Sequence, residues 1–300
     1  MMLADAVAEM KEGKFKDFSM NEDERYELYL AAWLHDCGKV ATPPHVVDKG
    51  TKLETIFDRI ELIKTRMELL KKDQEIAFLR RQLNGQSNIE FDDEYNKAIS
   101  ELDSSMKFLE ECNVGGEFMK PELQEKVRSI GAKKLNIFNR EQPFLSEEEI
   151  QNLNIPKGTL LPDEREIIND HIVITIEMLE QLPYPKNLKN IPEFAGGHHE
   201  KMDGTGYPKG LNESQMSIQA KIMAIADIYE ALTAADRPYK EGKKLSQAMR
   251  IMGFMKNDYH IDEELFEIFV TSGVYREYAE KHVAKTQIDE VDEKSVLGKE

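Results

Sequence analysis

Two short stretches carry most of the information in this 300-residue chain: His-His-Glu-Lys-Met-Asp-Gly-Thr-Gly-Tyr-Pro-Lys-Gly-Leu at residues 198–211 and His-Asp-Cys-Gly-Lys at residues 35–39. Each combines imidazoles and carboxylates with glycines, which let the backbone approach a ligand closely. The adjacent pair His198-His199 precedes a glycine-rich turn, where two imidazoles contribute little to packing. We therefore interpret both stretches as parts of one chemical site.

Two further residues extend the set of candidate ligands. His171 lies in a predicted helix over residues 163–182, and Asp227 interrupts the apolar run 222–228, where a carboxylate is costly unless it is paired or bound to a cation. Taken singly, each residue would be an ordinary surface or core group. Helical proteins build metal sites from imidazoles and carboxylates of separate helices, and such a mixed set suits iron, manganese, nickel or zinc better than calcium. The combination therefore predicts a metal site.

The charge balance restricts the class of partner. A formal net charge of -17 argues against a general DNA- or RNA-binding protein, which would present a basic face to the phosphate backbone. An acidic protein can still act on a phosphate ester where metal ions and a few cations such as Lys39 invert the local field. Cys37 and Cys112 match no metal or redox spacing, and neither a secretion signal nor a membrane-spanning stretch is recognisable. We expect reduced thiols and a cytoplasmic location.

Helical periodicity recurs along the chain while strand patterns are sparse, so we predict an all-α fold. One expected helix covers residues 23–36, and its apolar face is predicted to contain Tyr26, Leu30, Trp33 and Leu34. Another covers residues 217–234 and carries Asp227. The charged tail after residue 286 is expected to be frayed.

A heptad pattern marks the segment between the two motifs. Residues at alternating spacings of three and four form an apolar seam, which resumes after a turn at residues 85–88. The members are Leu53, Ile56, Ile60, Ile63, Met67 and Leu70, then Ile99, Leu102, Met106 and Leu109. This pattern predicts an antiparallel, coiled-coil-like helical hairpin. It is either a solvated arm packed on its own core or a dimerisation and signal-relay arm through residues 51–115, and the sequence favours neither.

The motifs also resemble a known family. The stretch at residues 35–39 resembles the signature of the HD phosphohydrolase superfamily, and residues 198–211 resemble the motif that names its HD-GYP family. Residues 227–233 and 236–240 are similar to the family's next block. The resemblance implies an HD-type helical bundle, which we expect to comprise residues 1–50 and 151–285. Residues 51–150 would then be the inserted hairpin, and residues 286–300 a charged tail.

The resemblance implies a role for each matching residue. The metal ligands would be His35, Asp36, His171, His198, His199 and Asp227, with Asp36 bridging two or three divalent ions. Iron or manganese is expected first, with zinc or nickel as alternatives. Asp36 and Lys39 would be catalytic, with Lys39 touching the scissile phosphate. The substrate would also contact Gly206, Tyr207, Arg237 and Lys240, the last two at a guanine edge and a phosphate. For Tyr207, simple turn chemistry is an equally good interpretation.

The implied activity is hydrolysis of cyclic di-GMP to linear pGpG or GMP by a metal-dependent phosphodiesterase. Two alternatives stay open: a catalytically impaired cyclic-dinucleotide receptor, and an HD phosphohydrolase for another cyclic dinucleotide. The family usually carries a further histidine upstream of the HD pair, whereas no histidine precedes His35 here. We interpret residues 1–10 as the end of that helix, with the missing ligand and an N-terminal sensor domain belonging to the full-length protein.

Overall fold

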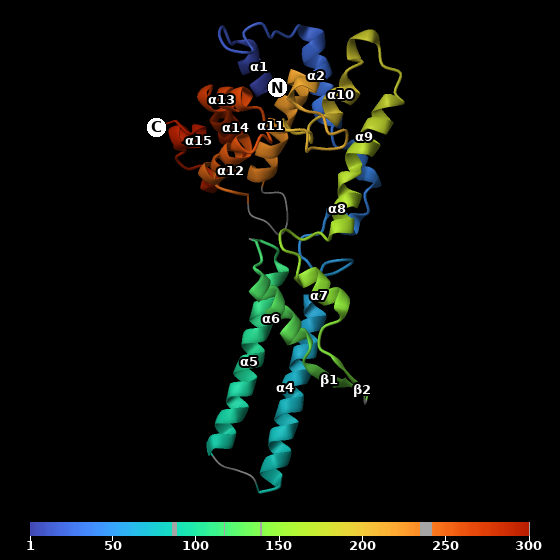
Figure 1. Cartoon of the computed structure of the whole chain (residues 1–300), viewed down its shortest axis with the longest axis vertical. Coiled ribbons are helices and arrows are strands. Elements are labelled where there is room, and N and C mark those ends of the chain that lie inside the picture. The colour runs from blue at the N-terminus through green and yellow to red at the C-terminus, as the bar shows by residue number, and fades with distance from the viewer. Residues whose placement is uncertain (86–88, 117, 139, 235–241, 300) are drawn as a thin grey trace. The chain divides into compact units, whose positions relative to one another are not determined.

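The computed structural model describes residues 1–85, 89–116, 118–138, 140–234 and 242–299. The chain forms two compact units, one comprising Met1–Pro43 with Glu166–Glu300 and the other Pro44–Arg165. Both are coloured along the chain in Figure 1. The inserted segment therefore folds on its own core, between two parts of a first unit that are distant in sequence.

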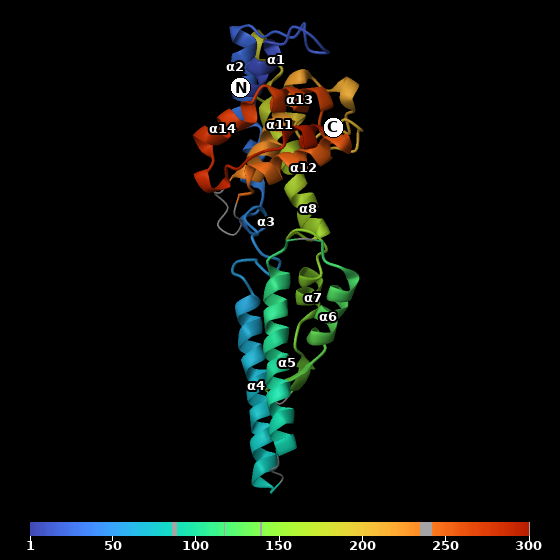
Figure 2. The same cartoon turned by 90° about the vertical axis from the view of Figure 1, so that its left-hand side faces the viewer.

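The described residues of the first unit form helices joined by loops, and their only strand-like pairing is an isolated bridge between Asp203 and Asn212. Its longer elements are α1 (Met2–Ala8), α2 (Glu22–Leu34), α9 (His171–Glu180), α10 (Ile191–Gly196), α11 (Ile218–Thr233), α12 (Leu245–Asn257), α13 (Glu263–Thr271), α14 (Val274–His282) and α15 (Glu293–Leu297). Short 3-10 turns cover Cys37–Ala41, Lys186–Leu188, Glu213–Gln215 and Lys285–Gln287. Figure 2 shows α11 in the middle of this unit, near α12, α13 and α14. The predicted helix over residues 217–234 is confirmed, and it contributes Ile222 and Ile225 to the main core.

The buried face of α2 differs from the prediction. Asn21 and Glu24 form a capping box that starts the helix as expected from such residues. However, Tyr26 is 53% exposed and Trp33 is 72% exposed, while Glu27 is buried. The Glu27 carboxylate accepts hydrogen bonds from the backbone and side-chain amides of Asn190, at 2.6 and 3.1 Å. Of the predicted face, Leu30 and Leu34 do pack against the core, whereas the two aromatic residues face outward and Glu27, with its own partner, is buried.

Two other expectations for this unit need correction. Residues 163–180 are helical as predicted apart from Asp170, which divides the helix into α8 (Pro162–Asn169) and α9. The tail is not frayed, because Gln287 is buried and donates to the carbonyl oxygens of Thr233 and Lys243 at 2.9 and 3.0 Å. α15 then follows, and Val291 before it is also buried.

The second unit contains the expected helical hairpin, formed by α4 (Ile60–Leu83) and α5 (Ile89–Asn113). Its core includes most of the predicted seam, namely Leu53, Ile60, Ile63, Met67, Leu70, Leu102 and Leu109. Ile56 is an exception at 96% exposed, because α4 begins only at Ile60. The unit also holds α3 (Pro44–Val47), α6 (Pro121–Gly131) and α7 (Glu147–Leu153).

A small antiparallel sheet corrects the all-α prediction in this unit. β1 (Lys134–Ile137) pairs with β2 (Arg140–Pro143), with Leu135 opposite Gln142. Only Leu135 is buried in these strands. Because the two strands expose most of their side chains, they lack the alternating apolar pattern that would have identified them. None of the helices in the described residues is long and apolar enough to cross a membrane.

Candidate metal centre

Six histidine and aspartate side chains converge in the first unit from segments that are distant in sequence. Their possible ligand atoms form two overlapping groups, each with all atoms within 4.8 Å of one another. One group contains Asp36, His171, His198 and His199, and the other contains His35, Asp36 and Asp227. Asp36 belongs to both groups. Every residue that the sequence singled out as a ligand therefore lies in this cluster.

The shortest contacts centre on Asp36. His171 Nε2 lies 3.1 Å from Asp36 Oδ1, and His35 Nε2 lies 3.3 Å from Asp36 Oδ2. Lys39 Nζ donates to Asp36 Oδ2 at 2.5 Å. His35 Nε2 is also 3.6 Å from Asp227 Oδ1. The two oxygens of Asp36 thus face different histidines, an arrangement in which one carboxylate can serve two cations.

Three of the four imidazoles are oriented by the same type of contact to a backbone carbonyl oxygen. His35, His171 and His198 each lie one or two residues beyond a helix end, and each Nδ1 contacts the carbonyl oxygen three residues earlier. The distances are 2.7 Å for His35 to Ala32 and 2.6 Å for His198 to Ala195. A carbonyl can only accept, so Nδ1 carries the proton, and a neutral ring then keeps Nε2 free as a ligand. Helix ends, which leave carbonyls without partners, thereby set the tautomer.

The electrostatics of the cluster call for positive charge. Burial would lower the pKa of His35, but hydrogen bonds to Asp227 and Asp36 outweigh it and raise that pKa to about 10. Burial would raise the pKa of Asp36 and of Asp227, yet hydrogen bonds from the histidines hold both well below the usual range. Two carboxylates are therefore ionised in a partly buried site. Without a metal, His35 takes up a proton and supplies the cation that they require.

The remaining histidines are suited to metal ligation. Burial lowers the pKa of His198 to about 4, and burial together with His198 lowers that of His199 to about 3, so both rings are neutral at pH 7. Within the described residues, His198 Nε2 is buried without a hydrogen-bond partner. His199 Nε2 lies 3.3 Å from His171 Nε2. A divalent cation would satisfy these nitrogens at once, so the donor set fits a divalent metal.

Gly38 explains why the motif at residues 35–39 reaches His171. A Cβ at this position would lie 2.0 Å from the His171 carbonyl oxygen and 2.6 Å from the Thr175 amide nitrogen. The Gly38 amide instead donates to Thr175 Oγ1 at 2.9 Å. Only glycine permits this approach, which places the turn directly against α9 and brings Asp36 to His171.

Glu200 organises the glycine-rich loop beside the cluster. This side chain is buried, and its two carboxylate oxygens accept the backbone amides of Lys209 and Leu211 at 2.7 and 2.8 Å. A Cβ on Gly206 would lie 2.4 Å from the Glu200 Cα, so the loop closes against Glu200 only with glycine there. The Tyr207 ring stacks on His199 with centroids 4.8 Å apart. Sequence reasoning missed Glu200, although an acidic residue directly after two candidate ligands was a usable signal.

Of the other predicted substrate contacts, some lie at the cluster and some fall outside the described residues. Lys39 and Tyr207 touch members of the cluster, and Gly206 packs on Glu200. Arg237 and Lys240 fall in residues 235–241, outside the described residues.

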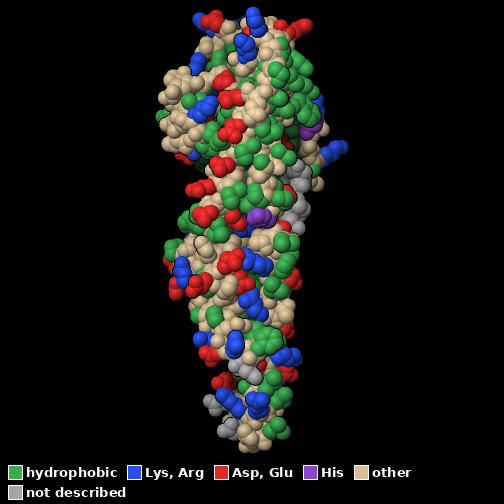
Figure 3. Space-filling model, turned by 90° about the vertical axis from the view of Figure 1, so that its right-hand side faces the viewer, with side chains coloured by type: hydrophobic (Ala, Val, Ile, Leu, Met, Phe, Trp, Pro, Cys, Tyr) green, Lys and Arg blue, Asp and Glu red, His purple; other side chains and the backbone are tan. Residues whose placement is uncertain are grey.

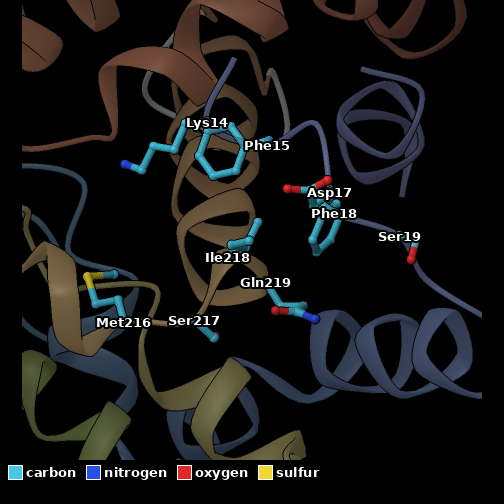
Figure 4. Close-up of a pocket in the computed structure, with 9 residues that line it drawn as sticks. All are labelled: Lys14, Phe15, Asp17, Phe18, Ser19, Met216, Ser217, Ile218 and Gln219. Carbon is cyan, nitrogen blue, oxygen red and sulfur yellow. The ribbon is translucent and has the colours of Figure 1, made fainter. Parts of the chain in front are cut away.

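A cavity of about 530 Å³ lies elsewhere in the first unit, between residues 14–19 and residues 216–219. Figure 4 shows its lining residues at the N-terminal end of α11. Ile218 precedes Asp227 by nine residues, about 13 Å along a helix, and none of the six clustered side chains lines this cavity.

Fold and site together define a helical protein with a histidine–aspartate centre suited to divalent metals. Residues 147–265 match the HD domain family, and this part of the chain is an HD domain. The predicted relation to the HD superfamily is therefore confirmed. The match does not include His35 and Asp36, which are separated from it by the inserted unit and reach it only in three dimensions.

The curated relatives are named as cyclic-dinucleotide phosphodiesterases. The chain is 36% identical over 94 residues to 3'3'-cGAMP-specific phosphodiesterase 1 of Vibrio cholerae, covering 31% of this chain and 21% of that protein. It is 44% identical over 79 residues to a cyclic di-GMP phosphodiesterase of Pseudomonas aeruginosa, covering 26% of this chain and 18% of that protein. It is 41% identical over 93 residues to a cyclic di-GMP phosphodiesterase of Thermotoga maritima, covering 31% of this chain and 25% of that protein. The chain thus spans about a fifth to a quarter of these relatives.

Proposed function

We propose that this protein is a metal-dependent phosphodiesterase that hydrolyses cyclic di-GMP to linear pGpG, to GMP, or to both. One observation carries the proposal: six histidine and aspartate side chains meet around Asp36 in an HD domain whose relatives are named cyclic-dinucleotide phosphodiesterases. The protein would act in the cytoplasm, where Cys37 and Cys112 stay reduced.

The six clustered residues would hold two divalent metal ions, with Asp36 shared between them. Iron or manganese suits this donor set first, zinc or nickel second, and a third ion would need a ligand from elsewhere. Bound divalent ions supply an activated water and offset negative charge on the phosphate. The chain's own part is to fix the imidazoles through Ala32, Ile168 and Ala195, and to present Lys39 beside Asp36.

Lys39 would contact the scissile phosphate. Its side chain is 41% exposed and lies against Asp36, so the ammonium can turn from the carboxylate to an incoming phosphate. Tyr207 would line the substrate side of His199, with Gly206 allowing the loop to lie close. Arg237 and Lys240 would read a guanine edge and a second phosphate.

The relatives divide between two dinucleotide substrates. Some are named for cyclic di-GMP and others for 3'3'-cGAMP, at comparable identity. The second candidate function is therefore hydrolysis of a mixed cyclic dinucleotide at the same centre. A receptor that binds without turnover is the third.

Turnover of both dinucleotides by protein loaded anaerobically with iron or manganese tests the proposal. Linear product from cyclic di-GMP that disappears in Asp36→Ala, and persists in the exposed control Glu280→Gln, supports it. Turnover of 3'3'-cGAMP alone establishes the second candidate. Tight binding without product from metal-loaded protein establishes the receptor, and neither binding nor turnover overturns all three.

Two proposals concern partners. We propose that an N-terminal sensor domain in the full-length protein supplies the input signal, and that the hairpin of residues 51–115 mediates a homodimer. A helical arm with its own core is a suitable rigid element for relaying a signal between two copies.

A further inference from the structure

Helix α4 carries a second apolar row besides the seam that packs in the hairpin core. Its members are spaced by seven residues: Leu62, Leu69, Ile76 and Leu83, with Leu79 between the last two. All five side chains are exposed: Leu62 by 47%, Leu69 by 44%, Ile76 by 46%, Leu79 by 47% and Leu83 by 87%. We call these five residues the outer seam. A spacing of seven keeps side chains on one face of a helix over several turns.

The outer seam is not a general feature of the hairpin surface. Among the described side chains of α5, residues 92–113, no large hydrophobic residue is exposed. Figure 3 shows hydrophobic side chains interspersed with charged ones along the hairpin unit. Single exposed leucines are ordinary in proteins, but a regular row from Leu62 to Leu83, which lie about 32 Å apart along the helix, is typical of an interaction surface.

The spacing points to the kind of partner that covers the row. Heptad repeats are the pattern by which helices pair in coiled coils, and an identical helix always carries a matching row. In a parallel pair, a residue at the flanking g position faces the e position five residues later in the partner helix. Glu75 would then face Arg80 of the second copy, whereas Arg66, the counterpart of Glu61, is held within its own unit by Glu149 and the Phe144 carbonyl oxygen.

The core positions favour the parallel arrangement. The flanking charges do not decide it, because Glu75 with Arg80 is attractive and Glu68 with Asp73 is repulsive. The intervening core positions hold Thr65, Lys72 and Leu79. An antiparallel pair would set the leucine row against Thr65 and Lys72, whereas a parallel pair stacks Leu62, Leu69, Ile76 and Leu83 on their own counterparts.

We propose that α4 pairs with α4 of a second copy of this chain in a parallel, in-register coiled coil through the outer seam. This inference rests on the proposal that the hairpin mediates a homodimer, and it adds the surface, the orientation and the register. It involves neither metal nor dinucleotide, so its failure and the failure of the phosphodiesterase proposal are observed in separate experiments.

Sedimentation equilibrium of the full chain at several concentrations tests the surface. We expect a dimer for the wild type and a monomer for Leu69→Glu/Ile76→Glu, with unchanged helicity by circular dichroism because both residues are exposed. The matched control Ser100→Glu/Ser104→Glu adds the same charge to the exposed face of α5 and should remain dimeric. A dimer that survives the outer-seam substitutions overturns the surface alone, and a wild type that is monomeric throughout overturns the homodimer as well.

Cysteine crosslinking tests the register. In a parallel, in-register pair, Ile76→Cys places two thiols at the same level of the helix interface, so mild oxidation should yield a disulfide-linked dimer that the wild type does not give. Glu75→Arg should weaken association several-fold, and Glu75→Arg/Arg80→Glu should restore it. A dimer in which Ile76→Cys fails to crosslink overturns the parallel register.

Discussion

Each unit buries a nitrogen-bearing side chain, Lys52 in the hairpin unit and His198 in the first unit, and the two side chains differ in their partners. In the hairpin unit, buried Lys52 donates to the carbonyl oxygens of Leu153 and Ile155 at 2.9 and 2.8 Å, and its hydrogen-bonding capacity is used within the chain. In the first unit, His198 Nε2 is buried without a partner in the described residues. Buried polar groups in proteins are normally satisfied, so each exception calls for a reason. Arg59 Nη2 and Asn154 Oδ1 of the hairpin unit also have no partner in the described residues, but neither belongs to a group of candidate metal ligands. The unpaired nitrogen of His198 does belong to such a group, and this combination indicates a functional role.

The largest expected effect is on metal binding, and it tests that distinction directly. His198→Ala should weaken Mn²⁺ binding more than about 100-fold, because loss of an outer partner alone costs about 10–100-fold. Isothermal titration of metal-free protein measures it. Lys52→Met is the control from the other unit and should leave the affinity unchanged. Equal Mn²⁺ affinities for wild type and His198→Ala would show that the unpaired nitrogen is not a metal ligand.

Glu200 sharpens the comparison, because it is a fully satisfied buried group that lies beside the site. In Glu200→Gln, an amide donor replaces one acceptor and faces the amide of Lys209 or Leu211. The loop that stacks Tyr207 on His199 should shift, which we expect to lower turnover about 10–100-fold as for other small misplacements near a reacting group. Mn²⁺ affinity should remain near wild type.

Kinetics and titration of the same preparation distinguish the two roles of Glu200. Lower kcat or higher KM with intact Mn²⁺ binding identifies a positioning residue. Loss of Mn²⁺ binding would instead make Glu200 part of the metal centre, and unchanged kinetics would make the loop irrelevant to the reaction.

Stability should respond to the substitution in the hairpin unit. Lys52→Met leaves the Leu153 and Ile155 carbonyls without their donor, and we expect it to lower the free energy of unfolding of the hairpin unit by ~1–3 kcal/mol. Metal-free His198→Ala also loses stability, through the buried ring and its Nδ1 hydrogen bond to the Ala195 carbonyl oxygen, but not through Nε2. Urea unfolding of both variants measures this. An unchanged free energy of unfolding in Lys52→Met would show that its two hydrogen bonds do not stabilise the hairpin unit.

Much of the site could be predicted because its chemistry is local in sequence. Asp227 in an apolar run and two adjacent histidines before a glycine turn are unusual at the level of residues, and the six predicted ligands do lie together. Glu200 could not be assigned a role, because its partners Lys209 and Leu211 are recognised only once the loop has closed. The helix-end carbonyls that orient three imidazoles likewise need the helix boundaries.

The fold was predictable where apolar residues recur at a regular spacing. It was not predictable where contacts with residues distant in sequence determine which side chain is buried. The hairpin seam follows its heptads, with Ile56 outside because the helix begins later. The buried face of α2 was misassigned because Glu27 is held by Asn190, a contact of 163 residues' separation that no local pattern reveals. The small sheet escaped because its strands are mostly exposed.

The smallest effect concerns pH and a satisfied ion pair in the hairpin unit. Burial would raise the pKa of Glu149, but hydrogen bonds from Arg66 and the Ser146 amide outweigh it and hold the pKa below its model-compound value of 4.5. A depressed folded-state pKa contributes stability that is present above the unfolded pKa and is lost as pH falls through the folded one. Between pH 7 and pH 4, wild type should therefore lose more stability than Glu149→Gln, by no more than ~1 kcal/mol for one partly exposed partner. Urea unfolding at pH 7, 5 and 4 measures the difference, and a steeper loss in Glu149→Gln would show that the pair does not stabilise the unit.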